Sequence, residues 1–123
     1  MFLPHALQIH RDTDGTATET HAAKLLRGKP CDTALVAEVS YTGGDTDTVV
    51  VFDVECSVDG SEWVVVDRLT AEDGKEYVVT TEGRETAILP YIRGKTTVIG
   101  TAPSAINTVI LVGSTGPLTA EAV

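Results

Sequence analysis

The chain is poor in aromatic residues, cysteine and positive charge, and each shortage excludes a class of protein. Six aromatic residues in 123 leave Val, Ile, Leu and Ala to build most of the core. Two cysteines, Cys31 and Cys56, are too few for a disulfide scaffold. We expect both to be small buried apolar groups, although a disulfide between them stays open. Nine Lys and Arg against 18 Asp and Glu give a net charge of −9, which argues against binding to nucleic acid or an anionic membrane.

Long apolar runs are also missing. No stretch approaches the roughly 20 apolar residues that a membrane-spanning helix needs. The first ten residues carry no basic segment and are interrupted by Pro4 and His5, so we do not expect a signal peptide. A length of 123 residues fits one domain that can bury a real core.

What the sequence does contain is threonine, valine and a period of two. The 18 threonines and the many valines favour the half-buried surface of a sheet. Apolar residues occupy every second position of 35–41 and the even positions of 49–58, while Asp53 and Glu55 fall on the opposite face of the second segment. This alternation predicts strands with one buried and one wet face.

Turn signals divide the rest of the chain into short strands. Asp59-Gly60 between two alternating segments is typical of a β-hairpin, and Trp63 would then pack near Val58 in the core. We therefore predict an all-β antiparallel sandwich, jelly-roll or immunoglobulin-like, with seven to nine strands. Residues 31–112 would form its core, 1–30 an irregular N-terminal arm with a possible edge strand at 16–23, and 113–123 a flexible tail. Further turns are expected at 73–74 and 82–83, and further strands at 76–80, 86–89, 91–101 and 107–112.

Candidate metal ligands cluster in the first third of the chain. Three histidines can hold zinc, but their spacings of 5 and 11 match no ligand motif. The acidic loop at residues 12–19 resembles a calcium loop in its oxygen content, yet it lacks a third acidic ligand and the terminal spacing. We therefore predict no metal site and regard these groups as surface residues: His5, His10, His21, Asp12, Asp14, Gly15 and Glu19.

No catalytic motif is recognisable. The chain has no Gly-x-Ser-x-Gly segment and no cysteine with a nearby histidine. Asp53 and Glu55, two apart on a strand, give a wet acidic face rather than an acid/base pair in a cleft. Asp45 and Asp47 fit a solvated turn. We predict that the protein is not an enzyme and needs no cofactor.

Four segments of the chain resemble small structural proteins of tailed bacteriophages. Their usual layout is an early Gly-Thr-Ala-Thr segment, a Ser-x-Asp-Gly-x-x-Trp hairpin, and a late Tyr-x-Arg strand that ends in Gly-Thr-x-Pro-Ser. The layout agrees with this chain over about residues 15–112, although Gly94 replaces a usually bulky strand residue and the last strand lacks the usual aromatics. The matching segments are Gly15-Thr16-Ala17-Thr18, Ser57 to Trp63, Tyr91-Ile92-Arg93 and Gly100 to Ser104.

The resemblance implies a virion protein on the outer capsid surface, of the decoration or cement type. Such proteins clamp neighbouring copies of the major capsid protein, and many are homotrimers. Under this hypothesis Phe2, Leu3, Leu7 and Ile9 would contact a capsid subunit or a neighbouring copy. The alternative is that they cover the edge of the domain's own core. Another virion part, such as a connector, tail or fibre domain, and a carbohydrate- or surface-binding module also stay open.

Overall fold

A computed structural model describes residues 5–28, 33–72, 77–82, 89–114 and 117–123 of the chain. These residues form strands and no helix, so none of them belongs to a helix that could cross a membrane. The strands are β1 (His5–Gly15), β2 (Glu19–Thr20), β3 (Lys24–Gly28), β4 (Thr33–Thr42), β5 (Val49–Ser57), β6 (Val64–Glu72), β7 (Tyr77–Glu82), β8 (Tyr91–Ile99), β9 (Ala105–Ser114) and β10 (Leu118–Ala122).

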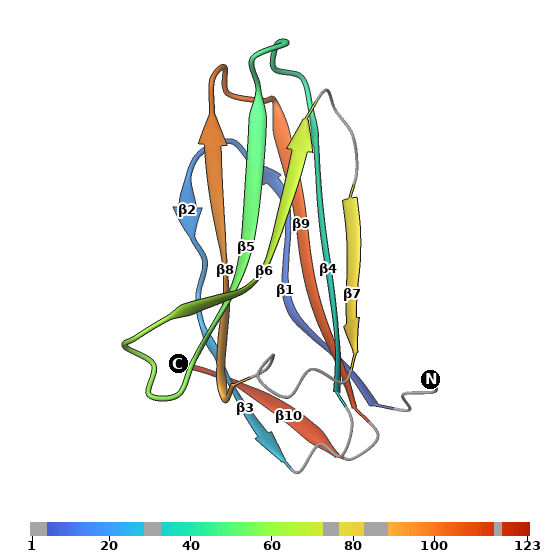
Figure 1. The fold of residues 1–123 in the computed structure, drawn as a ribbon, viewed down its shortest axis with the longest axis vertical. Helices are drawn as coiled ribbons and strands as arrows, with labels where there is room; N and C mark the ends of the chain where they lie inside the picture. The colour runs from blue at the N-terminus through green and yellow to red at the C-terminus, as the bar shows by residue number, and fades with distance from the viewer. Residues whose placement is uncertain (1–4, 29–32, 73–76, 83–88, 115–116) are drawn as a thin grey trace.

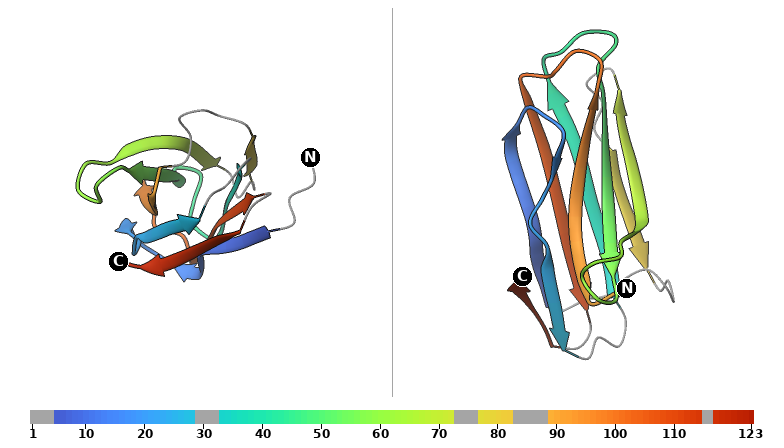
Figure 2. Two further views of the ribbon diagram at one scale, coloured as in Figure 1. Left: turned by 90° about the horizontal axis from the view of Figure 1, so that it is seen from below. Right: turned by 90° about the vertical axis from the view of Figure 1, so that its left-hand side faces the viewer.

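The strands form two antiparallel sheets that face each other, which confirms the predicted β-sandwich (Figure 1, Figure 2). One sheet has the order β1-β9-β4-β7, and the other has the order β10-β3-β8-β5-β6, with β2 paired to β8. The pairs β5–β6, β4–β7, β3–β8 and β1–β9 are nested around the middle of the chain. This nesting is the strand order of a jelly roll, which settles the topology that the alternation pattern left open.

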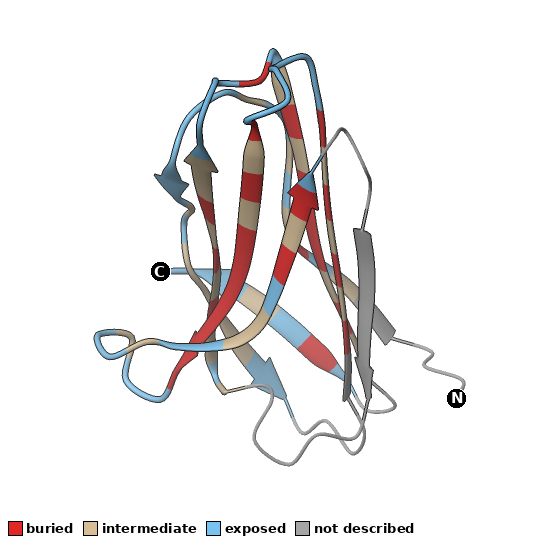
Figure 3. Cartoon of the chain, turned by 45° about the horizontal axis from the view of Figure 1, so that its top comes forward, coloured by how far each residue is buried: buried red, intermediate tan, exposed pale blue. Residues whose placement is uncertain are grey.

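The core lies between the sheets and follows the predicted alternation. Val50, Phe52, Val54 and Cys56 on β5 are fully buried, and Leu35, Val39 and Tyr41 face them from β4 (Figure 3). Cys56 is a free thiol, and burial raises its pKa. Cys31 lies outside the described residues, as do the turn predicted at 73–74 and most of the strand predicted at 86–89. Of the turn predicted at 82–83, Glu82 is the last residue of β7 and Gly83 lies outside the described residues.

The prediction of an irregular arm and a loose tail was wrong for the described parts of both ends. β1 is an edge strand that pairs with β9 from His5 to Gly15, and β10 pairs with β3. The physical reason is visible in β1, where the register shifts between Gln8 and His10 and again between Asp12 and Gly15. Each irregularity interrupts the period of two by which a strand is recognised. The edge strand suggested at 16–23 is reduced to the two residues of β2.

Gly94 has a packing role that explains why no bulky residue stands there. It is buried on β8 opposite Val54, and a Cβ atom at this position would lie 2.7 Å from Cε1 of Phe52 and 3.2 Å from Cδ1 of Ile110. A real Cβ atom does not approach so closely. The Phe52 ring therefore fills the space that a side chain at position 94 would need.

Candidate functional site

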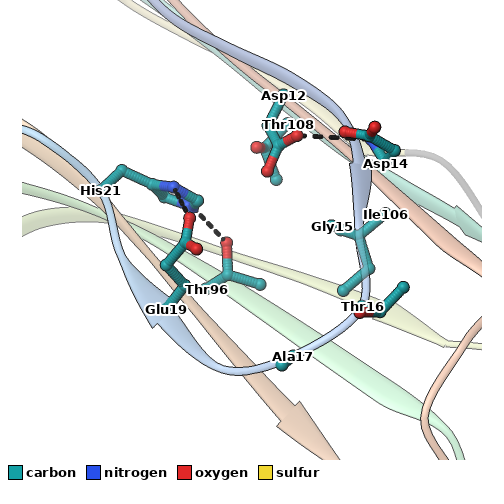
Figure 4. Close-up of a pocket in the computed structure, with 10 residues that line it drawn as sticks. All are labelled: Asp12, Asp14, Gly15, Thr16, Ala17, Glu19, His21, Thr96, Ile106 and Thr108. Carbon is teal, nitrogen blue, oxygen red and sulfur yellow. Dashed lines mark hydrogen bonds and ion pairs between the residues drawn. The ribbon is translucent and has the colours of Figure 1, made fainter.

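A pocket of about 370 Å³ opens where the edge of one sheet meets the other (Figure 4). Asp12 reaches it from β1 of the four-stranded sheet, Glu19 from β2 of the other sheet, and His21 from the segment that follows β2. One ligand atom from each of these three side chains lies within 4.8 Å of those of the other two. Carboxylate oxygens and an imidazole nitrogen are groups that bind divalent cations, so these three side chains are the part of the pocket that can act as metal ligands.

The His21 ring is held on both nitrogens. Nδ1 lies 2.8 Å from Oε2 of Glu19, and Nε2 lies 2.8 Å from Oγ1 of Thr96 on β8. The side chain is only 7% exposed, whereas that of Glu19 is 61% exposed. The ring also stacks on His10, with 4.2 Å between centroids. His21 is therefore a fixed group, and Glu19 is a carboxylate at the solvent side of the pocket that can adjust its position.

His10 stands behind His21 and is not free to take up a proton at neutral pH. Its Nε2 lies 2.7 Å from Oγ1 of Thr108, and its ring packs 5.8 Å from the Phe52 ring. Burial, with a smaller contribution from His21, lowers the pKa of His10 to about 4. His10 is therefore a neutral side chain that packs behind His21, which lines the pocket.

The pKa of His10 predicts acid-sensitive stability. Unfolded His10 binds a proton below about pH 6.5, but folded His10 does so only below about 4. The unfolded state therefore binds more protons in this window, so the free energy of unfolding falls as the pH drops from 6.5 to 4. Because His10 is only half-buried, we expect a loss of about 1–2 kcal/mol after solvent screening.

Urea unfolding at several pH values, with EDTA present, measures this effect. The matched variant His10→Gln keeps a polar side chain opposite Thr108 but cannot titrate. The difference in stability between the two proteins should shrink as the pH falls from 6.5 to 4. A difference that stays constant across the window would contradict the lowered pKa.

A second notable feature is the β5–β6 hairpin, which projects from the side of the sandwich (Figure 1). The predicted turn is confirmed, but its loop is longer than a two-residue turn, because β5 ends at Ser57 and β6 begins at Val64. Asp59 organises the loop: its Oδ1 accepts hydrogen bonds from the backbone N–H groups of Ser61 and Glu62, at 2.9 and 3.1 Å, and from Ser57 Oγ at 3.0 Å. These bonds hold the pKa of Asp59 far below its usual range. The carboxylate of Asp59 therefore stays charged and fixes the conformation of the loop.

The hairpin carries apolar side chains into solvent. Val58 is 70% exposed, Val64 53% and Val65 45%. Val58 was predicted to face the core, but the loop begins at this residue and turns it outward. Val58 and Val64 line a shallow hollow of about 190 Å³ together with Leu89. Exposed apolar residues gathered on a projecting element are typical of a contact surface for another protein.

The outer face of the six-stranded sheet beside the hairpin is not the wet acidic face that was predicted. Asp53 and Glu55 are 5% and 8% exposed, because arginines from the neighbouring strands cover them. Arg68 on β6 donates two hydrogen bonds to Asp53, at 2.7 and 2.9 Å, and Arg93 on β8 donates one to Glu55 at 2.8 Å. Cross-strand pairing places each arginine opposite its carboxylate.

Trp63 belongs to this surface and not to the core. Its side chain is half-buried, and the Arg93 guanidinium lies over its ring, 4.0 Å from the centroid. The sequence prediction of a core tryptophan was therefore wrong, because the hairpin leaves the body of the sandwich before Trp63. Since one ring face carries Arg93 and Tyr91 is also half-buried, the exposed aromatic group expected of a sugar-binding face is not formed by these two residues.

The four residues predicted to contact a capsid subunit lie in different parts of the chain's structure. Phe2 and Leu3 lie outside the described residues. Ile9 is 4% exposed and belongs to the core, and Leu7 is half-buried and packs against it. For Leu7 and Ile9 the structure thus favours the alternative that they cover the domain's own core, because β1 closes the edge of the sandwich.

The sequence contained the pocket residues but not their proximity. His10, Asp12, Glu19 and His21 were all noted as candidates and dismissed, because their spacing matches no motif. Their meeting depends on the tight return of the chain between β1 and β2, for which the only local signal is Gly15 between polar residues. The side chain of His5 lies outside the described part of the chain.

Comparison with known proteins adds no relative. No protein-family model matches the chain, and no match is found among curated proteins. Its function must therefore be argued from the fold and from these two surfaces.

Proposed function

We propose that this protein is a virion structural component of a tailed bacteriophage, and specifically a decoration protein on the outer face of the capsid. The observation that carries the proposal is the β5–β6 hairpin, which presents Val58, Val64 and Val65 to solvent beside a rigid Asp59-centred loop. This hairpin is also one of the segments that resemble phage structural proteins, although Gly100 to Ser104 is the more specific of them. The hairpin is thus the docking element of the proposal, and the major capsid protein is its partner.

Charge and fold agree with that role. A net charge of −9 suits a surface that faces solvent and does not bind packaged DNA. A two-sheet jelly roll is a rigid support from which a hairpin can project, and jelly rolls are common in viral capsid proteins, although fold alone does not assign function. Decoration proteins are often homotrimers, and we extend that state to this chain as part of the proposal.

Co-sedimentation with capsid shells tests the proposal. The shells are assembled from the major capsid protein encoded in the same genome, in expanded and unexpanded forms. We expect the protein to pellet with expanded shells and the variant Val58→Asp/Val64→Asp to stay in the supernatant, because each carboxylate would have to be buried at the contact. The matched control is Ile99→Asp, which changes an equally exposed residue at the opposite end of β8 and should bind normally.

Two outcomes would contradict the proposal. If the folded wild-type protein fails to pellet with either form of shell, the decoration role is wrong, and binding to purified tails instead would point to another virion part. If both variants bind equally well, the hairpin is not the docking element. Deleting residues 1–4 tests the remaining N-terminal contribution without removing β1, and sedimentation equilibrium reports whether a trimer forms in solution.

A further inference from the structure

We propose that Asp12, Glu19 and His21 form a binding site for one divalent transition-metal ion of the zinc type, which ties the two sheets together. The inference is independent of the capsid role, because it concerns residues at β1 and β2, and β2 is separated from the β5–β6 hairpin by β8 in the six-stranded sheet. It rests on the geometry of the pocket described above, where a ligand atom of Asp12 on β1 meets those of Glu19 on β2 and of His21 two residues later.

The distances fit a metal ion after small movements. Zinc holds nitrogen and oxygen ligands at about 2.0–2.2 Å in a tetrahedron, so two of its ligand atoms lie about 3.3–3.6 Å apart. The three ligand atoms here lie within 4.8 Å of one another. Figure 4 shows Asp12 across the hollow from Glu19 and His21. Rotation of the exposed Glu19 side chain and a slight approach of Asp12 would bring all three to the ion.

His21 is already oriented as a metal ligand. A ligating histidine usually directs its second ring nitrogen to a hydrogen-bond acceptor, which fixes the tautomer. Here Nε2 of the buried ring faces Oγ1 of Thr96, and in the tautomer that donates to Thr96 the lone pair of Nδ1 points at Glu19 Oε2, 2.8 Å away. At 2.8 Å these two atoms share a proton, so a metal ion that binds both would displace it and move the Glu19 oxygen out to about 3.3–3.6 Å from Nδ1.

The charge around the pocket also favours a cation. Among the described residues, no lysine or arginine forms an ion pair with Asp12 or Glu19, whereas Asp53 and Glu55 each have an arginine. The open pocket leaves room for water to complete the coordination, as in zinc sites with three protein ligands. The imidazole nitrogen selects zinc and its neighbours over calcium or magnesium, which prefer oxygen ligands alone.

Binding would have a mechanical result. Asp12 belongs to the sheet that contains β1 and β9, and Glu19 to the sheet that contains β8. An ion bound to both Asp12 and Glu19 would link the two sheets at the edge where β1 lies beside β2. Because a ligand that binds only the folded state stabilises it, the melting temperature should rise with the ion concentration.

Isothermal titration calorimetry with ZnCl₂ on EDTA-treated, desalted full-length protein tests the site. We expect one ion per chain and a melting temperature about 5–10 °C higher at a hundredfold excess over Kd. Asp12→Asn and Glu19→Gln should each weaken binding at least about tenfold, which is the loss of one ordinary ligand contact. Both residues are at least partly exposed, so these variants should fold, whereas the buried His21 is left unchanged. Asp14→Asn, which alters another acidic residue of the same pocket, is the control and should bind as the wild type does.

Three results would overturn the inference. One is the absence of both heat and a thermal shift at millimolar ZnCl₂ while the protein is folded. Another is unchanged zinc affinity in Asp12→Asn and Glu19→Gln, or an equal loss of affinity in Asp14→Asn. Either result would mean that zinc binds at another site or is attracted only by the overall negative charge of the surface. Tighter binding of CaCl₂ than of ZnCl₂ would refute the assignment of the ion.

Discussion

Replacing Phe52 with alanine is expected to lower the free energy of unfolding by about 3–5 kcal/mol, the usual loss for a buried phenylalanine. Phe52 is fully buried at the centre of β5, and its ring contacts those of His10 and His21 at 5.8 and 6.3 Å between centroids. Denaturant unfolding followed by circular dichroism measures the loss. Val123→Ala, at a residue 75% exposed, is the surface control and should change stability by less than about 0.5 kcal/mol.

Gly94 gives this prediction a sharper test. A methyl group at position 94 would collide with the Phe52 ring, so Gly94→Ala alone should cost about 1–3 kcal/mol. In the Phe52→Ala protein the ring is gone and the same methyl group would enter the cavity. The cost should then fall, and a double-mutant cycle should give a clear coupling energy. Simple additivity would contradict the proposed complementarity of the two residues.

Replacing Arg93 with methionine is expected to cost about 2–3 kcal/mol. The Glu55 side chain is 11% exposed, and without Arg93 its carboxylate would lose its hydrogen-bonded partner and keep only the electrostatic interaction with Arg68. The Arg93 side chain is 25% exposed, so the loss should be somewhat smaller than for a fully buried pair. The contact of the guanidinium with Trp63 would be lost as well.

Arg27 provides the matched control for this effect. It pairs with Glu121 at 2.9 Å, almost the same distance as the Arg93–Glu55 pair, but the two side chains are 61% and 53% exposed. Arg27→Met should therefore cost less than about 1 kcal/mol. Chemical unfolding of both variants at low and high salt makes the comparison. Equal losses for Arg27→Met and Arg93→Met would show that burial does not govern the strength of these pairs.

The alternation of β4 and β5 was sufficient to predict both strands and the faces that enter the core, because β4 pairs with β7 and β9, and β5 with β8, without a register shift. The one shift of β5, against β6, places its extra residue on β6. The same rule failed for β1, whose two register shifts bring polar and apolar residues out of phase. It also failed for Asp53 and Glu55, since alternation distinguishes the two faces of a strand but does not reveal the arginines that neighbouring strands place over one of them.

The candidate site illustrates a different limit. A metal motif is recognised by ligand spacing within one element, but Asp12 lies on β1, and Glu19 and His21 follow it after the chain has crossed to the other sheet. The residues that fix the two histidines, Thr96 and Thr108, lie 75 and 98 positions from their partners. Such sites depend on the pairing of distant strands, which local patterns do not specify. The β5–β6 hairpin was easier to predict, because Asp59 and Gly60 determine it locally.

The nested strand order also governs when the fold can form during synthesis. Among the strands that the structure describes, β5 and β6 are consecutive partners, whereas β4–β7, β3–β8 and β1–β9 join segments that lie progressively further apart along the chain. Distant pairs must overcome a larger loss of chain entropy before their contacts stabilise them. Within its sheet β1 is synthesised first, yet its partner β9 is synthesised after β4 and β7. The four-stranded sheet therefore cannot be completed until β9 has been translated.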